Sequence, residues 1–213
     1  LDPIDREIIL SQEFEKQEIN FLVDQIKLNK VNYFLDIGAN CGYYSLIISK
    51  EISSIKIISF EPNIEAYSKF SKTLKKNLYL SKKIKLKKFG LSNISAKLKM
   101  QSMLKHGYAQ TGGTSIINEN LNIKNFTFFA DFKVGDDYLK LSDEKISIKI
   151  DVEGHELNVL KGIQNIIKKN QCILQIEIFE KNFEKVNNFL LSFGYTNFYE
   201  VKNRSNYFYK NFI

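Results

Sequence analysis

The chain has 213 residues, 44% of them hydrophobic, which is enough for one domain with a sizeable core and too little for two. Its ten Gly and two Pro exclude a collagen-like or a disordered composition. The net charge of +7 comes from lysines scattered along the chain, so it indicates a solvated surface rather than a nucleic-acid footprint, and no nucleic-acid partner is expected.

The cysteines and the apolar runs indicate the compartment. Cys41 and Cys172 lie far apart and form no CxxC pair, which excludes a disulfide scaffold or a zinc site and favours a reducing, cytoplasmic setting. No apolar run is long enough to span a membrane, and the first ten residues carry charges where a signal peptide has its apolar core. The sequence does not indicate an oligomeric state.

The first half of the chain alternates helices and strands. An apolar stripe at helical spacing predicts a helix over residues 12–28, within an N-terminal helical region of residues 1–30. A strand over residues 33–37, a helix over 43–50 and a strand over 55–60 follow. Pro62 then suits the start of a helix that reaches about residue 79. A third strand is expected around residues 84–86. Residues 93–125 show no regular pattern and are expected to form an irregular insertion or lid.

The second half continues the alternation. Strands are predicted over residues 126–134, 146–151 and 172–179, with helices beginning at about residues 155 and 181. The last two strands, 195–201 and 207–212, have no helix between them. The prediction is one α/β domain over residues 1–213, with a mostly parallel seven-stranded sheet, helices on both faces and an antiparallel C-terminal hairpin at one edge. Ligands of such sheets bind where the parallel strands end.

The turn after the first strand reads DIGANCG and is a candidate cofactor site. A dinucleotide fingerprint would need glycine at positions 40 and 43, which are Asn40 and Tyr43, and no Gly-Lys-Ser/Thr phosphate loop follows. What remains is Asp36, the glycines four residues apart, and Glu61 at the end of the second strand. Asp36 can favour a positive charge, the glycines let a flat ligand approach the backbone, and Glu61 can accept hydrogen bonds from ribose hydroxyls. These features together suit a cationic nucleoside without phosphate, such as S-adenosylmethionine. The simpler interpretation of the glycines is a tight strand-to-helix turn.

Several blocks in order resemble one family. FLDIGANCGYYSL, FEPNIEAYSKF, GGTSI and IKIDVEGHELNVLKGI are similar to blocks of the FkbM-type methyltransferases, and the resemblance covers roughly residues 34–179. It implies the Rossmann-like class I fold, S-adenosylmethionine as cofactor with S-adenosylhomocysteine as product, and methylation of hydroxyl groups of a sugar, glycan or natural product. It also implies which residues contact the cofactor: Asp36, Gly38, Asn40 and Gly42 along its length, Glu61 at the ribose, and Ser92 and Asn93 near the adenine. Asn93 stands where the family usually has Asp.

Methyl transfer to a hydroxyl is helped by a general base. Asp151, at the end of the strand over residues 146–151, is the first candidate. His155 could titrate near neutral pH, but it equally suits a histidine at a helix start. His106 lies in the expected insertion and is interpreted as an ordinary loop histidine.

Three alternatives stay open at this point. Asp151, Glu153 and Glu177 could form an oxygen-rich magnesium site, which we rank below a metal-free site. The small residues of TGGTS, positions 111–115, could hold a sugar or a cofactor carboxylate, or form only a turn. The same cofactor site would also serve an RNA or protein methyltransferase, or a binding module without turnover. The expected partner is a small-molecule or glycan acceptor.

Overall fold

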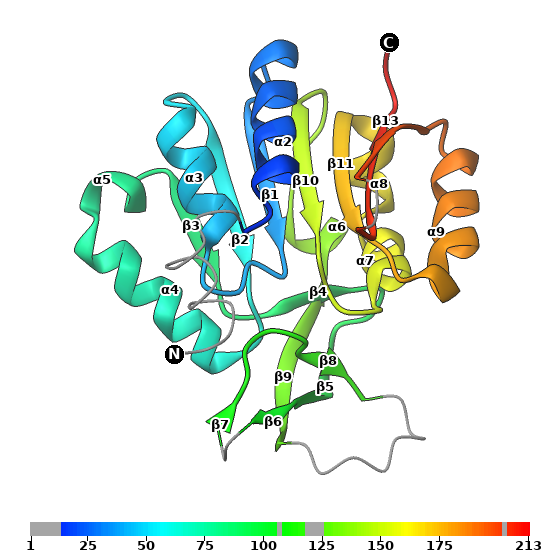
Figure 1. The fold of residues 1–213 in the computed structure, drawn as a ribbon. Helices are drawn as coiled ribbons and strands as arrows, with labels where there is room; N and C mark the ends of the chain where they lie inside the picture. Colours follow the sequence, from blue (N-terminus) through cyan, green and yellow to red (C-terminus); the bar gives the residue numbers. More distant parts are fainter. Residues whose placement is uncertain (1–13, 106–107, 118–125, 202–203) are drawn as a thin grey trace.

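A computed structural model describes residues 14–105, 108–117, 126–201 and 204–213 of the chain. His106 lies outside the described residues. The main sheet has seven strands in the order β12-β13-β11-β10-β1-β2-β3 (Figure 1). Its parallel strands are β1 (Tyr33–Ile37), β2 (Lys56–Phe60), β3 (Ile84–Lys87), β10 (Lys145–Ile150) and β11 (Gln171–Glu177). The last strand, β13 (Asn206–Lys210), runs antiparallel between β11 and β12 (Thr196–Glu200), which confirms the predicted hairpin edge.

Helices cover both faces of this sheet and divide the core into two layers. Side chains alternate along each strand, so Phe34 packs in one layer and its neighbour Leu35 in the other. The Phe34 layer lies under α2 (Lys16–Asn29), α3 (Tyr43–Glu51) and α4 (Ile64–Lys76). The Leu35 layer lies under α7 (Glu156–Gly162), α8 (Gln164–Lys169) and α9 (Glu180–Ser192), beside the short α6 (Gly135–Tyr138). The strands are apolar on both sides because both sides are covered.

Local signals fix where several helices begin and end. The side chain of Asn63 accepts hydrogen bonds from the backbone N–H groups of Glu65 and Ala66, at 2.8 and 3.3 Å, and so caps α4. Gly194 follows α9 with φ +78°, as expected of a C-terminal glycine. The helix expected up to residue 79 breaks at Asn77 into α4 and α5 (Leu78–Ser81).

A second, four-stranded sheet lies against the end of the main sheet, and it corrects the expectation for residues 93–125. Its order is β4-β9-β5-β8, with β4 (Gly90–Ser92), β5 (Ala96–Ser102), β8 (Ser115–Ile116) and β9 (Phe126–Val134). The segment is therefore not irregular throughout, because β5 pairs antiparallel with β9 along its whole length. Met100, Ala130 and Phe132 form a small core between these two strands. The pair β6 (Leu104–Lys105) and β7 (Tyr108–Ala109) extends from this sheet.

Within the described ranges, no helix has both the length and the apolar character needed to cross a bilayer.

Candidate functional site

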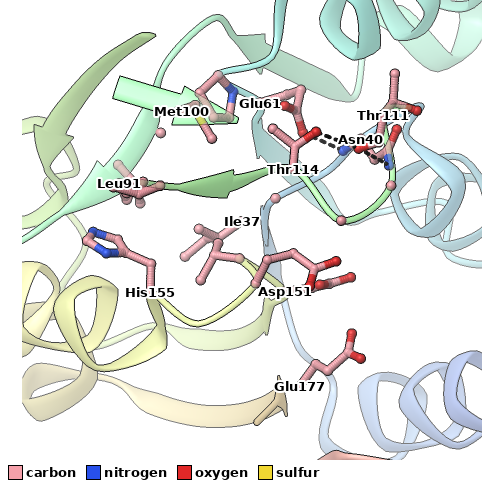
Figure 2. A pocket seen from close by; sticks show the side chains of 18 of the residues that line it. Ile37, Asn40, Glu61, Leu91, Met100, Thr111, Thr114, Asp151, His155 and Glu177 are labelled. Carbon is pink, nitrogen blue, oxygen red and sulfur yellow. Dashed lines mark hydrogen bonds between the residues drawn. The ribbon is translucent and has the colours of Figure 1, made fainter. Parts of the chain in front are cut away.

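A pocket of about 260 Å³ lies between the two sheets, where the parallel strands β1, β2, β10 and β11 end (Figure 2). One wall comes from the ends of these strands, and the other comes from the second sheet and the segment before β8. The pocket combines an apolar end with a group of carboxylates. Its lining residues are Phe14, Glu15, Ile37, Gly38, Asn40, Glu61, Pro62, Gly90, Leu91, Met100, residues 111–114, Ile116, Phe132, residues 151–153, His155 and Glu177.

The turn after β1 needs both of its glycines, for different reasons. Gly38 has φ +84°, and a Cβ there would collide with the backbone carbonyl oxygen of Asp151. Gly42 has φ +87°, and a Cβ there would collide with the ring of Phe70 on α4. Gly38 lines the pocket, whereas Gly42 holds the turn against a helix and is not part of the lining. Gly38 is thus placed where a ligand in the pocket can reach it, and Gly42 is not; contact of Gly38 with the cofactor stays a prediction.

Glu61 directly follows β2 and is buried, with 5% of its surface exposed. Its two carboxylate oxygens each accept one backbone N–H, from Asn40 and from Asn63, both at 2.7 Å. Burial raises its pKa to about 7, against the lowering effect of these two hydrogen bonds. Because each carboxylate oxygen has two lone pairs, the fixed carboxylate keeps capacity for two further donors on a ligand.

Asp36 is not on the pocket wall, contrary to the expectation that it lines the cofactor. It is 1% exposed, and its Oδ2 accepts a hydrogen bond from Ser45 at 2.5 Å. The strand alternation explains this position, because Ile37 points to the pocket and its neighbour must point to the opposite layer. Burial raises the pKa of Asp36, while the charge of Lys149 on the adjacent strand opposes that shift.

His155 and the two residues expected near the adenine form a chain of hydrogen bonds. Asn158 Nδ2 lies 3.1 Å from His155 Nδ1, His155 Nε2 lies 2.8 Å from Ser92 Oγ, and Ser92 donates to Asn93 Oδ1 at 3.2 Å. With Asn158 donating to Nδ1, Nε2 carries the proton and donates to Ser92. Both ring nitrogens therefore have partners. Ser92 and Asn93 support the histidine and do not line the pocket.

The expectation that His155 titrates near neutral pH is wrong. Burial lowers its pKa to about 4, so the ring is neutral at pH 7. The alternative interpretation, a histidine at a helix start, matches its place as the N-cap residue of α7. Its ring nevertheless lines the pocket, edge-on to Phe132 at a centroid distance of 6.0 Å.

Asp151, the candidate base, follows β10 and forms an ion pair with Lys149, whose Nζ lies 2.8 Å from its Oδ2. Lys149 is only 6% exposed, and its ammonium lies 4.6 Å from the centre of the Tyr44 ring. Burial lowers the pKa of this lysine, but the negative charges of Asp151, Glu15 and Asp36 outweigh burial and raise it. Lys149 therefore stays charged. Lys149 was not among the site residues predicted from the sequence.

Three other carboxylates share this end of the pocket. Burial, and then the charge of Asp151, raise the pKa of Glu177 to about 8 and that of Glu153 to about 7, and burial raises that of Glu15. Glu153 has φ +53° and Gly154 has φ +99°, so a left-handed turn follows β10 where Glu153 lines the pocket. Among the described residues, no lysine or arginine lines the pocket. No group of three or more His, Cys, Asp or Glu in those same ranges is arranged to hold a metal ion.

The apolar end of the pocket comes mainly from the second sheet. Leu91 lies on β4, Met100 on β5, Ile116 on β8 and Phe132 on β9. Figure 2 shows Leu91, Met100 and His155 at the far end from Glu177. Sequence reasoning missed Met100 and Ile116 because both lie in the segment that was expected to be irregular, and it missed the facing Leu91 and Phe132 because the second sheet was not predicted.

A family model for the methyltransferase FkbM domain matches residues 36–196, which is more than half of the chain. The chain belongs to the FkbM methyltransferase family. A curated relative, methyltransferase sdnD of Sordaria araneosa, is 29% identical over an alignment of 160 residues, and the match covers 62% of this chain and 60% of that protein. These matches confirm the resemblance read from the sequence motifs.

Solved structures place this FkbM-family chain in the class I methyltransferase fold. An FkbM methyltransferase from Methylobacillus flagellatus KT superposes with a TM-score of 0.60 at 16% identity, over 84% of this chain and 43% of that one. A precorrin-6y C5,15-methyltransferase from Geobacter metallireducens superposes with a TM-score of 0.50 at 13% identity, over 90% and 85% of the two chains. The predicted fold class is thereby confirmed. The chain spans less than two thirds of the length of the curated relative and of the FkbM structure that it matches.

Proposed function

We propose that this FkbM-family protein is an S-adenosylmethionine-dependent O-methyltransferase that acts on a hydroxyl of a sugar, glycan or natural-product acceptor. The observation that carries the proposal is Glu61, buried at the end of β2, with both oxygens fixed by backbone N–H groups and lone pairs left for a ribose diol. Gly38 beside it allows a ligand to approach the backbone.

The charges of the pocket fit this cofactor. S-adenosylmethionine carries a sulfonium, an ammonium and one carboxylate, so its net charge is positive. Five carboxylates line the pocket, and the nearest buried ammonium, that of Lys149, is already paired with Asp151. A pyrophosphate would meet these carboxylates without a positive side chain on the described lining, so NAD and ATP fit poorly. The side-chain oxygen of Asn40 is buried without a hydrogen-bond partner among the described residues, and it offers an acceptor to a ligand donor.

In this proposal, three groups of pocket residues contact three parts of the cofactor. Leu91, Met100 and Phe132 would hold the adenine, Glu61 would hold the ribose, and the carboxylate group around Asp151 would face the cationic end. The cofactor, when bound, supplies a methyl group already activated for displacement by an oxygen nucleophile.

The acceptor hydroxyl must give up a proton, and the chain offers carboxylates for it. Asp151 remains our candidate base, and its Oδ2 already forms an ion pair with Lys149. Burial raises the pKa of Glu177, at the end of the adjacent strand, to about 8, so this carboxylate can also take up a proton near neutral pH. His155 is neutral with both nitrogens engaged, so we assign it a positioning role at the apolar end. Carboxylates also suit an acceptor with several hydroxyl groups, because each oxygen can accept from one of them.

A melting experiment tests the cofactor assignment. Purified protein is heated with S-adenosylmethionine, S-adenosylhomocysteine, NAD or ATP, and only the first two should raise the melting temperature, because a ligand that binds the native state stabilises it. Glu61→Gln should reduce that rise, whereas Glu65→Gln, at an exposed position of α4, should leave it unchanged. The cofactor assignment fails if neither adenosyl compound shifts the melting temperature. Release of S-adenosylhomocysteine in the presence of polyhydroxy acceptors then tests turnover.

A further inference from the structure

The segment of residues 111–114, here the cover segment, lines the pocket between β7 and β8 and is held by side-chain hydrogen bonds. Asn40 Nδ2 donates to the carbonyl oxygen of Thr111 at 3.4 Å, and Asn63 Nδ2 donates to Thr114 Oγ1 at 3.3 Å. Figure 2 shows Asn40, Thr111, Thr114 and Glu61 close together, all above Ile37. The middle of the segment is Gly112-Gly113, and the backbone of Gly113 forms a hydrogen bond with the Glu153 carboxylate.

The same two asparagines also hold Glu61. The backbone N–H of Asn40 donates to Oε2 of Glu61, and that of Asn63 donates to Oε1, each at 2.7 Å. Each asparagine thus binds the glutamate with its backbone and the cover segment with its side chain. No such double connection follows from the sequence motif, because Asn40, Glu61 and Thr114 belong to three separate parts of the chain.

We propose that Asn40 and Asn63 are positioning residues that couple ligand binding at Glu61 to closure of the cover segment. This inference rests on the proposed use of S-adenosylmethionine. Ribose hydroxyls that donate to Glu61 add to the two backbone hydrogen bonds that already hold its carboxylate. The fixed carboxylate orients the two backbone N–H groups, and with them the two side-chain amides that reach the cover segment. Closure then retains the nucleoside, so the ribose contact and the closed state stabilise each other.

Thr114 is the residue through which this coupling reaches the second sheet. Its hydroxyl donates to the carbonyl oxygen of Thr111 at 3.1 Å and lies 2.9 Å from Ser102 Oγ on β5. The hydroxyl also lies 3.4 Å from the carbonyl oxygen of Gln110, and with Asn63 as a donor it takes part in four interactions. A serine can keep all four, and a valine of nearly the same shape can keep none. This pair of substitutions separates the hydrogen bonds from the packing.

S-adenosylhomocysteine is the probe for the test, because it cannot transfer a methyl group. Its dissociation rate is measured by surface plasmon resonance on immobilised protein. Asn63→Ser keeps an N-cap acceptor for α4 but is too short to reach Thr114. We expect Asn63→Ser and Thr114→Val to release the probe about five-fold faster, the factor that one hydrogen bond is typically worth. Thr114→Ser should match the wild type. Asn77→Ser is the control, because it removes an asparagine hydrogen bond at the other end of α4.

Hydrogen exchange distinguishes coupling from a general loss of structure. In the wild type, the probe should protect the turn after β1 and residues 108–117 together. In Asn63→Ser and Thr114→Val, the protection of residues 108–117 should be lost while that of the turn persists. Unchanged dissociation rates with full protection of both segments would overturn the coupling and leave the proposed function intact. Failure of the probe to bind the wild type would overturn the proposed function and, with it, this inference.

Discussion

S-adenosylmethionine should bind this protein more tightly as the pH rises from 6 to 7.5. Burial and the neighbouring Asp151 raise the pKa of Glu177 to about 8 and that of Glu153 to about 7, and burial raises that of Glu61 to about 7. Below these pKa values the free protein holds protons on the three side chains. A cation in the pocket favours the ionised carboxylates, so binding releases protons, and affinity for the cation must increase with pH.

The size of the effect follows from the fraction ionised. If binding requires ionised Glu177, a pKa of about 8 gives a rise in affinity of about 20-fold between pH 6 and 7.5. A group with a pKa of about 7, such as Glu61 or Glu153, gives about 8-fold over the same interval. The interval ends at pH 7.5 because the ammonium of the ligand itself begins to lose its proton near pH 8.

Isothermal titration calorimetry in two buffers of different ionisation enthalpy measures both the affinity and the number of protons released. S-adenosylhomocysteine lacks the sulfonium, so its affinity should depend less on pH. Glu177→Gln should flatten the pH dependence for S-adenosylmethionine, whereas Glu184→Gln, exposed on α9, should not. An affinity that stays constant or falls from pH 6 to 7.5, or proton uptake on binding, would refute the electrostatic reasoning.

Three further results are expected from measurements of stability. Without ligand, the melting temperature should fall between pH 5.5 and 8, because glutamates whose pKa is raised by folding favour the folded state only while protonated; a flat profile would argue against the raised pKa values. Gly38→Ala should cost more in urea unfolding than Gly194→Ala, which costs about 1–2 kcal/mol, since both glycines have positive φ but only the first Cβ would collide with the backbone; equal losses would contradict that. Lys149→Met should lower the free energy of unfolding by about 3 kcal/mol or more, because it leaves Asp151 without its cation. Lys27→Met, in the exposed pair with Glu51, should lower it by less than about 1 kcal/mol. Similar losses from both substitutions would show that the buried pair contributes little.

The main sheet could be predicted because its signals are local. Each parallel strand is a short apolar run, and each covering helix shows an apolar stripe of period 3.6. Pro62 and Gly194 mark the ends of their helices by backbone chemistry alone. The second sheet could not be predicted in the same way. The strand β5 has a visible alternation over only a few residues, and its partner β9 lies beyond a segment with no regular pattern.

A position at the end of a parallel strand predicted which residues line the pocket better than the type of side chain did. Gly38, Asn40, Glu61, Asp151 and His155 were all selected as residues at or after strand ends, and all line the pocket. Asp36 lies one residue before the end of β1, and the alternation of side chains along the strand therefore places it in the opposite core layer. The two residues after Leu91 were assigned by resemblance alone. Their side chains are engaged with the buried imidazole, a contact between distant segments that no spacing reveals.

Lys149 shows that one further site residue was readable from the sequence. It stands within ISIKID, a strand whose neighbours on both sides in the sheet are parallel and whose two faces are covered by helices. A lysine at such a position cannot reach bulk water, so it requires a carboxylate partner. Residues two apart in a strand point to the same face, and the acid two positions further on is Asp151. The sequence therefore already contained the buried ion pair between Lys149 and the candidate base.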